Sequence, residues 1–66
     1  MQNKLKIERA IHDLTQEDLA KKVGVSRQTI NSIEKKRYVP STVLALKIAQ
    51  LFNKSVNEIF QLEDED

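Results

Sequence analysis

The sequence predicts an all-α fold of five short helices in one domain. Sixty-six residues with one glycine and one proline contain few helix breakers. Thr15, Ser26, Ser41 and Ser55 each precede a segment with helical apolar spacing, where a hydroxyl caps a helix start. The chain is near the lower size limit for a core without disulfides, and it has no cysteine.

The first helix is expected to run from about Lys4 to His12, with Asn3 as a candidate cap. Its apolar surface is expected to consist of Leu5, Ile7, Ala10 and Ile11.

The second helix is expected at 16–23. Thr15 and Asp18 approximate a capping box at its start. Gly24, the only glycine, stands just after its end, where a left-handed residue is required. The turn at Gly24 leads to a third helix at 27–35, capped by Ser26.

The third helix has one apolar and one polar face. Ile30 and Ile33 form the apolar face, and Val25 is placed to pack on Ile30. The polar face has two rows at a spacing of four residues, which are Arg27, Asn31 and Lys35, and Gln28 and Ser32.

A loop at 36–40 leads to a fourth helix that starts after Ser41 and ends at about Phe52. This helix is apolar on most sides, so it is either central to the domain or buries a second face in a partner. Asn53 is a plausible left-handed residue after it. Ser55 and Glu58 form a capping box for a short fifth helix at 56–60.

The polar face of the third helix fits the donors and acceptors that base edges present in the major groove of DNA. The net charge is only +1, but residues 63–66 carry four of the ten acidic side chains. Residues 1–62 therefore hold eleven bases against six acids. A local basic patch is what phosphate binding requires, so the sequence predicts DNA binding.

The segments LTQEDLA, SRQTINSIE and YVPS, with the turn at Gly24, resemble the helix-turn-helix of the Cro/repressor-type (lambda-repressor-like, XRE-type) transcriptional regulators. The resemblance covers nearly the whole chain. It implies a five-helix lambda-repressor-like DNA-binding domain at 1–62, with the helix-turn-helix at about 15–35, and an acidic tail at 63–66. Lys36 stands where relatives often have glycine, so it either takes a left-handed conformation or the loop runs differently.

The chain is also similar to short regulators of the cytolysin-repressor type, which close the fold with an antiparallel strand pair from the two termini. Gln2-Asn3 and Gln61-Leu62 are the candidates for this pair. The segments are too short for periodicity to test.

The candidate base contacts lie at the start of the third helix and one turn later. Arg can read guanine and Gln adenine through two hydrogen bonds each, and the later pair faces either bases or phosphates. The base-contact candidates are Arg27, Gln28, Asn31 and Ser32. The phosphate-contact candidates are Gln16, Ser26, Thr29, Lys35, Lys36, Arg37 and Tyr38. The resemblance implies that Gln16 donates to a phosphate and can brace the recognition helix. Ser26 is a candidate for phosphate contact as well as a helix cap, and the capping role alone is enough to explain a serine there.

The resemblance also implies a structural ion pair between Arg9 and Glu34, which would fix the third helix against the first. The remaining charged features have plainer interpretations. His12 is a lone histidine, which makes a metal site improbable and a surface position the expected one. The acidic tail is expected to be disordered and solubilising, with cation binding as the alternative.

The leading function is a transcriptional regulator, a repressor that binds an inverted-repeat operator in double-stranded DNA as a homodimer in the cytoplasm. The last two helices contain more apolar residues than a 66-residue monomer is expected to bury. The candidate dimer interface is therefore Leu44, Leu51, Val56, Ile59, Phe60 and Leu62.

The alternative is an antitoxin-like or adaptor module whose fourth and fifth helices bind another protein. No constellation of acid, base and nucleophile supports an enzyme, and neither a metal nor another cofactor is expected. No apolar run approaches the roughly 20 residues of a membrane span.

Overall fold

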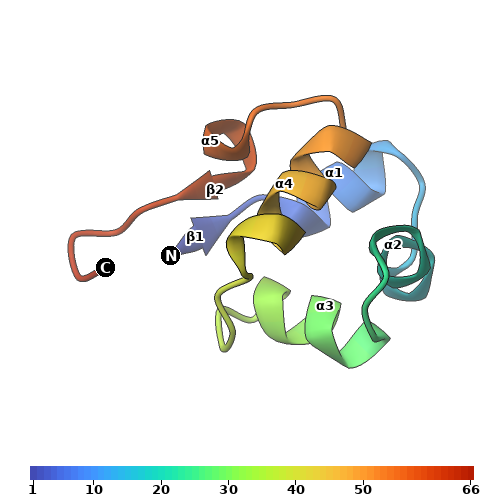
Figure 1. Cartoon of the computed structure of the whole chain (residues 1–66), viewed down its shortest axis with the longest axis horizontal. Coiled ribbons are helices and arrows are strands. Elements are labelled where there is room, and N and C mark those ends of the chain that lie inside the picture. Colours follow the sequence, from blue (N-terminus) through green and yellow to red (C-terminus); the bar gives the residue numbers. More distant parts are fainter.

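The computed structural model of the protein describes all 66 residues and contains five helices and one two-stranded sheet (Figure 1). The helices are α1 (Leu5–Ile11), α2 (Gln16–Val23), α3 (Arg27–Glu34), α4 (Thr42–Leu51) and α5 (Val56–Ile59). The strands are β1 (Gln2–Asn3) and β2 (Phe60–Gln61). The predicted all-α class with a terminal strand pair is confirmed. No helix is long and apolar enough to cross a bilayer.

The helix starts follow the capping residues of the sequence. Thr15 Oγ1 accepts from the Asp18 backbone N–H, and the Asp18 carboxylate accepts from the Thr15 N–H, both at 3.0 Å. Chiefly through this backbone hydrogen bond, the pKa of Asp18 lies below its ordinary value. Ser26 and Ser41 cap α3 and α4. Gly24 ends α2 with φ 78°, the conformation that glycine adopts without steric cost.

The strands bring the two ends of the chain together. Gln2 pairs with Gln61, and Asn3 pairs with Phe60. The second strand therefore lies one residue earlier than Gln61-Leu62, because Phe60 leaves α5 with an extended backbone (φ −118°, ψ 130°). Asn3 does not cap α1 from the flanking position, which is Lys4. It accepts instead from the Leu5 N–H at 3.2 Å.

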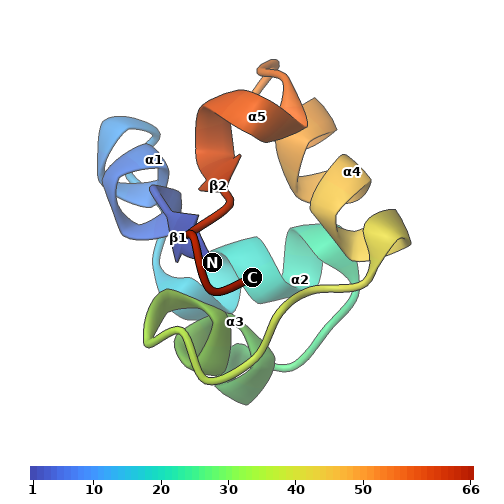
Figure 2. The same ribbon diagram turned by 90° about the vertical axis from the view of Figure 1, so that its left-hand side faces the viewer.

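The core draws on all five helices and on β2. Its twelve buried apolar residues are Leu5, Leu19, Ala20, Val23, Ile30, Ile33, Leu44, Ile48, Ala49, Phe52, Ile59 and Phe60. Figure 1 shows α4 across the middle of this arrangement, and α3 lies along the lower edge of the molecule in both Figure 1 and Figure 2.

The apolar surface predicted for α1 is wrong except at Leu5. Ile7, Ala10 and Ile11 are exposed, and the helix buries Glu8 instead. Glu8 Oε2 accepts from Lys54 Nζ at 2.6 Å. Because Leu5 and Glu8 share a helix face and Ile7 lies about 100° from Glu8, burying the ion pair turns Ile7 toward solvent.

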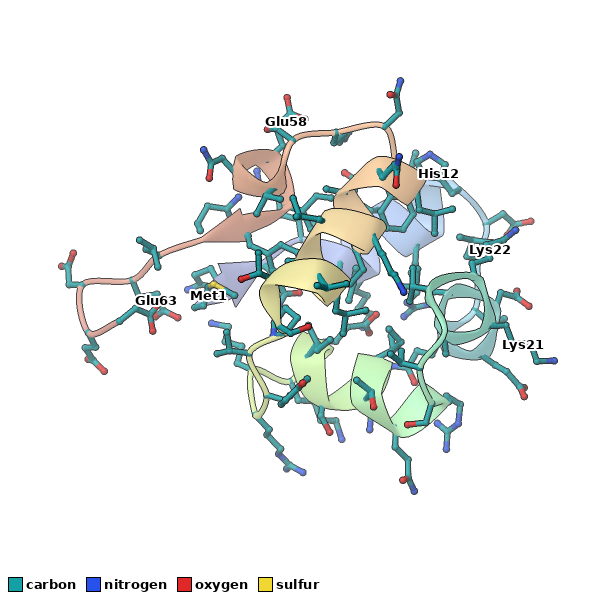
Figure 3. The ribbon with its side chains drawn as sticks, viewed as in Figure 1. Met1, His12, Lys21, Lys22, Glu58 and Glu63 are labelled. Carbon is teal, nitrogen blue, oxygen red and sulfur yellow. The ribbon has the colours of Figure 1, made fainter.

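The acidic tail lies against the first residue of the chain in the structure. The α-amino group of Met1 lies 3.1 Å from Glu63 Oε1 and 3.0 Å from Asp66 Oδ2 (Figure 3). The strand pair brings the positive end of the chain to the acidic segment, and opposite charges at this distance attract each other.

Lys36 takes the left-handed conformation, with φ 62°. Because glycine adopts this conformation without the clash of a Cβ atom, we expect Lys36→Gly to raise the free energy of unfolding by about 0.5–1 kcal/mol. Urea denaturation measures this change. The matched control is Lys35→Gly, at φ −85°, which should lower stability. A loss of stability in both variants would contradict the strain at Lys36.

Candidate nucleic-acid interface

The orientation of α3 is fixed by its apolar face. Ile30 and Ile33 are fully buried and pack into the core against α2. The α3 carbonyl of Ile33 also accepts from Asn3 Nδ2 at 2.9 Å, which ties the helix to β1. The opposite face is directed away from the remaining helices (Figure 2).

The outer face of α3 carries the four candidate base contacts. Arg27 and Gln28 are exposed at the first turn, and Asn31 and Ser32 are half-buried one turn later. Thr29 stands at the flank, with its hydroxyl 3.0 Å from the Ser26 hydroxyl. The structure thus places these four side chains on one surface of α3.

A basic segment follows α3 directly. Lys35, Lys36 and Arg37 are exposed, as is Tyr38. A shallow hollow of about 270 Å³ lies between the loop and the helix. It is lined by Ser26, Gln28, Thr29, Ser32 and Tyr38. Tyr38 therefore borders the outer face of α3. Lys35, Lys36 and Arg37 extend this surface at one end.

The start of α2 borders the other end of this surface. An open, largely polar hollow of about 480 Å³ is lined by residues from α1, α2 and α3, among them Arg9, Gln16 and Arg27. The backbone N–H groups at a helix start carry partial positive charge, which favours a phosphate. Gln16, predicted to contact phosphate, thus lies at the edge of the outer face of α3.

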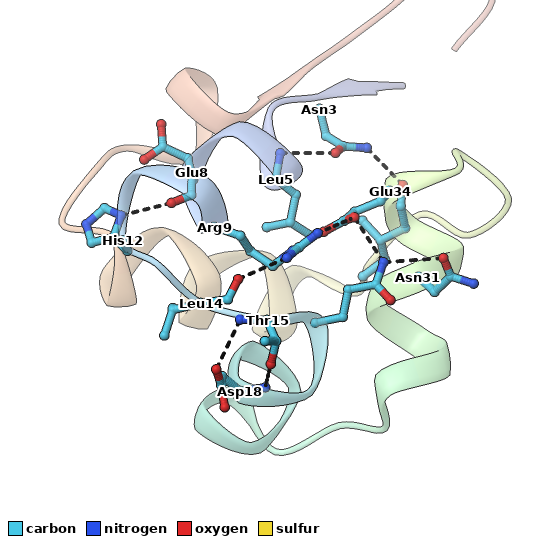
Figure 4. Close-up of polar contacts among 12 residues, drawn as sticks. Asn3, Leu5, Glu8, Arg9, His12, Leu14, Thr15, Asp18, Asn31 and Glu34 are labelled. Carbon is cyan, nitrogen blue, oxygen red and sulfur yellow. Dashed lines mark hydrogen bonds and ion pairs between the residues drawn. The ribbon is translucent and has the colours of Figure 1, made fainter.

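A hydrogen-bond network joins α1, α2 and α3 (Figure 4). Arg9 donates to Glu34 through Nε at 2.6 Å and through Nη2 at 3.0 Å, and its Nη1 donates to the Leu14 carbonyl at 2.9 Å. The hydrogen bonds to the Glu34 carboxylate raise the pKa of Arg9. Gln16 Nε2 donates to Glu34 Oε1 at 3.1 Å and to Asn31 Oδ1 at 3.3 Å. The ion pair expected between Arg9 and Glu34 is therefore formed.

Sequence reasoning missed the contact between Gln16 and Asn31. The only signal for it was the family role of Gln16 as a brace for the recognition helix, because fifteen positions separate the two residues. Local spacing rules do not reach across that separation.

Three of the six candidate dimer residues belong to the core. Leu44, Ile59 and Phe60 are buried within one chain, which corrects their assignment. Leu51 and Val56 are half-buried, and Leu62 is 81% exposed. The helices α4 and α5 turn their most apolar sides inward to close the core, so these three side chains are almost completely covered within one chain.

Further apolar side chains, which the sequence analysis did not select, are exposed near this end of the molecule. An apolar groove of about 320 Å³ is lined by Met1, Val39, Pro40, Thr42, Ala45, Leu46, Val56 and Phe60. Val39 and Leu46 are more than half exposed there. Sequence reasoning missed them because α4 is apolar around most of its circumference, so its pattern does not fix which side faces outward.

Comparison with known proteins identifies the family. A family model described as helix-turn-helix matches residues 5–59. An uncharacterized HTH-type transcriptional regulator of Methanocaldococcus jannaschii is 61% identical over the full length of both chains. Another, from Bacillus subtilis, is 48% identical, also over the full length of both.

A solved structure agrees with these relatives. The clp gene regulator ClgR of Corynebacterium glutamicum superposes with a TM-score of 0.75 and 26% identity over 82% of this chain. The match spans 57% of the ClgR chain. The family consists of non-enzymatic DNA-binding proteins. The chain therefore belongs to the Cro/repressor-type (XRE-type) helix-turn-helix family of transcriptional regulators.

Proposed function

We propose that the protein is a cytoplasmic, sequence-specific repressor that binds an inverted-repeat operator as a homodimer, with α3 of each copy in the major groove. The observation that carries this proposal is the outward face of α3, which is polar and anchored from behind by Ile30 and Ile33. Arg27, Gln28, Asn31 and Ser32 are proposed to contact bases.

Phosphate contacts are proposed on both sides of this face. Gln16 borders it at the start of α2, and the basic segment after α3 extends it. Their residues are Gln16, Ser26, Thr29, Lys35, Lys36, Arg37 and Tyr38. Such contacts fix the register of a protein on the duplex and carry no sequence information themselves. Repression would follow from occupancy, because a dimer bound over a promoter blocks access to the DNA beneath it.

The homodimer is proposed because one recognition helix buries too little surface to select one site in a genome. The apolar groove beside Val39 and Leu46 offers a surface for pairing that α3 does not use. Its lining is apolar except for Thr42. Two copies joined there would present two recognition helices to half-sites about one helical turn apart.

Selection of bound sequences from a random DNA pool tests the proposal. The expected result is an enriched inverted repeat whose half-site centres lie about 10 base pairs apart. Sedimentation equilibrium, with and without the selected DNA, measures the oligomeric state. A chain that stays monomeric in both conditions and shows no preference for inverted repeats would contradict the homodimer.

A protein-interaction module is the second candidate, and the apolar groove is the observation that favours it. An antitoxin-like or adaptor protein would use this groove for another protein. The DNA affinity of the purified chain separates the two functions, since an adaptor without DNA affinity would select no sequence from the pool.

Binding should weaken steeply as salt rises. Roughly 6–10 phosphate contacts per dimer release counterions, so affinity should fall by about 10³–10⁵ between 50 and 200 mM salt. Fluorescence anisotropy on the selected duplex measures the slope. Affinity that does not change with salt would remove DNA as the ligand and favour the adaptor.

Replacing a base-contacting residue should change the selected sequence, whereas replacing a phosphate-contacting residue should change only the overall affinity. Arg27→Ala and Gln28→Ala are expected to relax the selected sequence, each by about 1–3 kcal/mol of discrimination, because they remove contacts to base edges. Lys36→Ala is the comparison variant and should weaken all sequences about equally. If neither Arg27→Ala nor Gln28→Ala changes the selected motif, the recognition face is placed wrongly.

A further inference from the structure

In the hydrogen-bond network behind α3, the chemistry of Arg9 and Glu34 fixes which groups donate and which accept. Arg9 only donates hydrogen bonds, and the ionised carboxylate of Glu34 only accepts them. The distances of 2.6 and 3.0 Å between them define the inner end of the network. Any other side chain that hydrogen-bonds to the Glu34 carboxylate must therefore be the donor.

Glu34 determines the orientation of the Gln16 side-chain amide. Gln16 Nε2 lies 3.1 Å from Glu34 Oε1, where the amide oxygen would meet a second acceptor and be repelled. The same nitrogen lies 3.3 Å from Asn31 Oδ1. Asn31 must place its oxygen there, because its own nitrogen would face a donor.

The amide of Asn31 is thereby oriented relative to the outer surface of α3. Its oxygen is directed toward α2, and its nitrogen lies on the side away from the network (Figure 4). Asn31 is one turn beyond Arg27, in the same row of the recognition face. It thus presents a hydrogen-bond donor, without its acceptor, to whatever meets that face.

We propose that the Asn31 amide, held in this orientation by Gln16, selects guanine over adenine at the base it faces. This inference rests on the proposed function, in which the outer face of α3 meets base edges. A free asparagine amide pairs with adenine, whose N7 accepts and whose N6 amino group donates. Guanine offers two acceptors, N7 and O6, so a donor alone matches guanine and leaves the adenine amino group unpaired.

The DNA test compares base preferences rather than affinities. Asn31→Ala locates the base position, as the one whose preference disappears. At that position the unmodified protein should prefer guanine over adenine by about tenfold, the value of one hydrogen bond. Gln16→Met should abolish this preference or reverse it toward adenine, because the Asn31 amide is then free to turn. The matched control, Gln50→Met on the exposed side of α4, should leave the preference unchanged.

A second variant keeps the test independent of Gln16 itself. Asn31→Asp retains the acceptor for Gln16 Nε2 but presents a second acceptor outward. The selected base should then change to cytosine, whose N4 amino group donates in the major groove. Because Asn31 is half-buried on a helix surface, this replacement leaves the core untouched.

The free protein provides a readout without DNA. NMR measurement of side-chain amide hydrogen exchange should show slow exchange for the Gln16 NH₂ group and fast exchange for the Asn31 NH₂ group. The opposite order would overturn the proposed orientation.

Failure of this inference differs from failure of the proposed function. An unchanged guanine preference in Gln16→Met would overturn the role of Gln16, and an unchanged motif in Asn31→Ala would overturn base contact by Asn31. If the unmodified protein selects no sequence, the proposed function is overturned and with it the base choice, while the exchange data still report the amide orientation.

Discussion

Replacing Glu34 by alanine is expected to lower the free energy of unfolding by about 2–3 kcal/mol, because it leaves the Arg9 guanidinium without its partner. The two side chains are only 14% and 8% exposed, so water replaces the lost contacts poorly. For a domain of this size the melting temperature should fall by about 10–20 °C, which differential scanning calorimetry measures. Operator affinity should fall as well, since α3 loses its link to α1.

The matched control is Glu17→Ala, the same change in an exposed pair. Glu17 and Lys21 are 4.0 Å apart and mostly solvated, so the expected loss is below about 0.5 kcal/mol. The double variant Arg9→Met/Glu34→Met should recover part of the stability, because it removes both charges. Equal losses in Glu34→Ala and Glu17→Ala would mean that the buried pair has no special role.

Replacing Leu46 by aspartate is expected to raise the dimer dissociation constant by at least about a hundredfold, because two-fold pairing would bury two unpaired carboxylates in an apolar seam. Leu46 is 55% exposed in the single chain, so the fold should survive, as circular dichroism checks. Operator affinity should fall by a similar factor, since two linked half-site contacts become one. Sedimentation equilibrium and anisotropy measure the two effects.

Ile7→Asp is the matched control for the dimer prediction. Ile7 is 58% exposed on α1 and lines no part of the groove, so the same substitution removes a similar apolar surface elsewhere. It should leave both the dimer and operator binding unchanged. If Ile7→Asp dissociates the dimer and Leu46→Asp does not, the copies pair through α1, and the groove is free for another partner.

The ends of the helices could be predicted from the sequence because capping acts over three or four residues. Thr15, Ser26, Ser41 and Ser55 each precede a helix in the structure, and Gly24 ends α2 in the left-handed conformation. A hydroxyl that accepts from a backbone N–H three positions later needs no tertiary partner. The polar face of α3 followed from spacing alone for the same reason.

The inward sides of the helices depend on contacts between distant residues, and there the sequence predictions were least successful. Ile7 and Ile11 looked like core residues of α1, yet the structure buries Glu8 against Lys54, forty-six positions away. In α4 the apolar pattern surrounds the helix, so only packing decided that Leu44 turns inward and Leu46 outward.

Within the recognition site, the sequence determined which residue types stand on the outer face of α3, and the tertiary structure decided how one of them is oriented. Asn31 contains a donor and an acceptor, and nothing in its neighbours along the chain distinguishes them. The choice follows from Arg9 on α1 and Gln16 on α2, which meet Glu34 and Asn31 only after the helices pack. Hydrogen bonds act over about 3 Å, so a preference of this kind exists only once folding has brought the groups together.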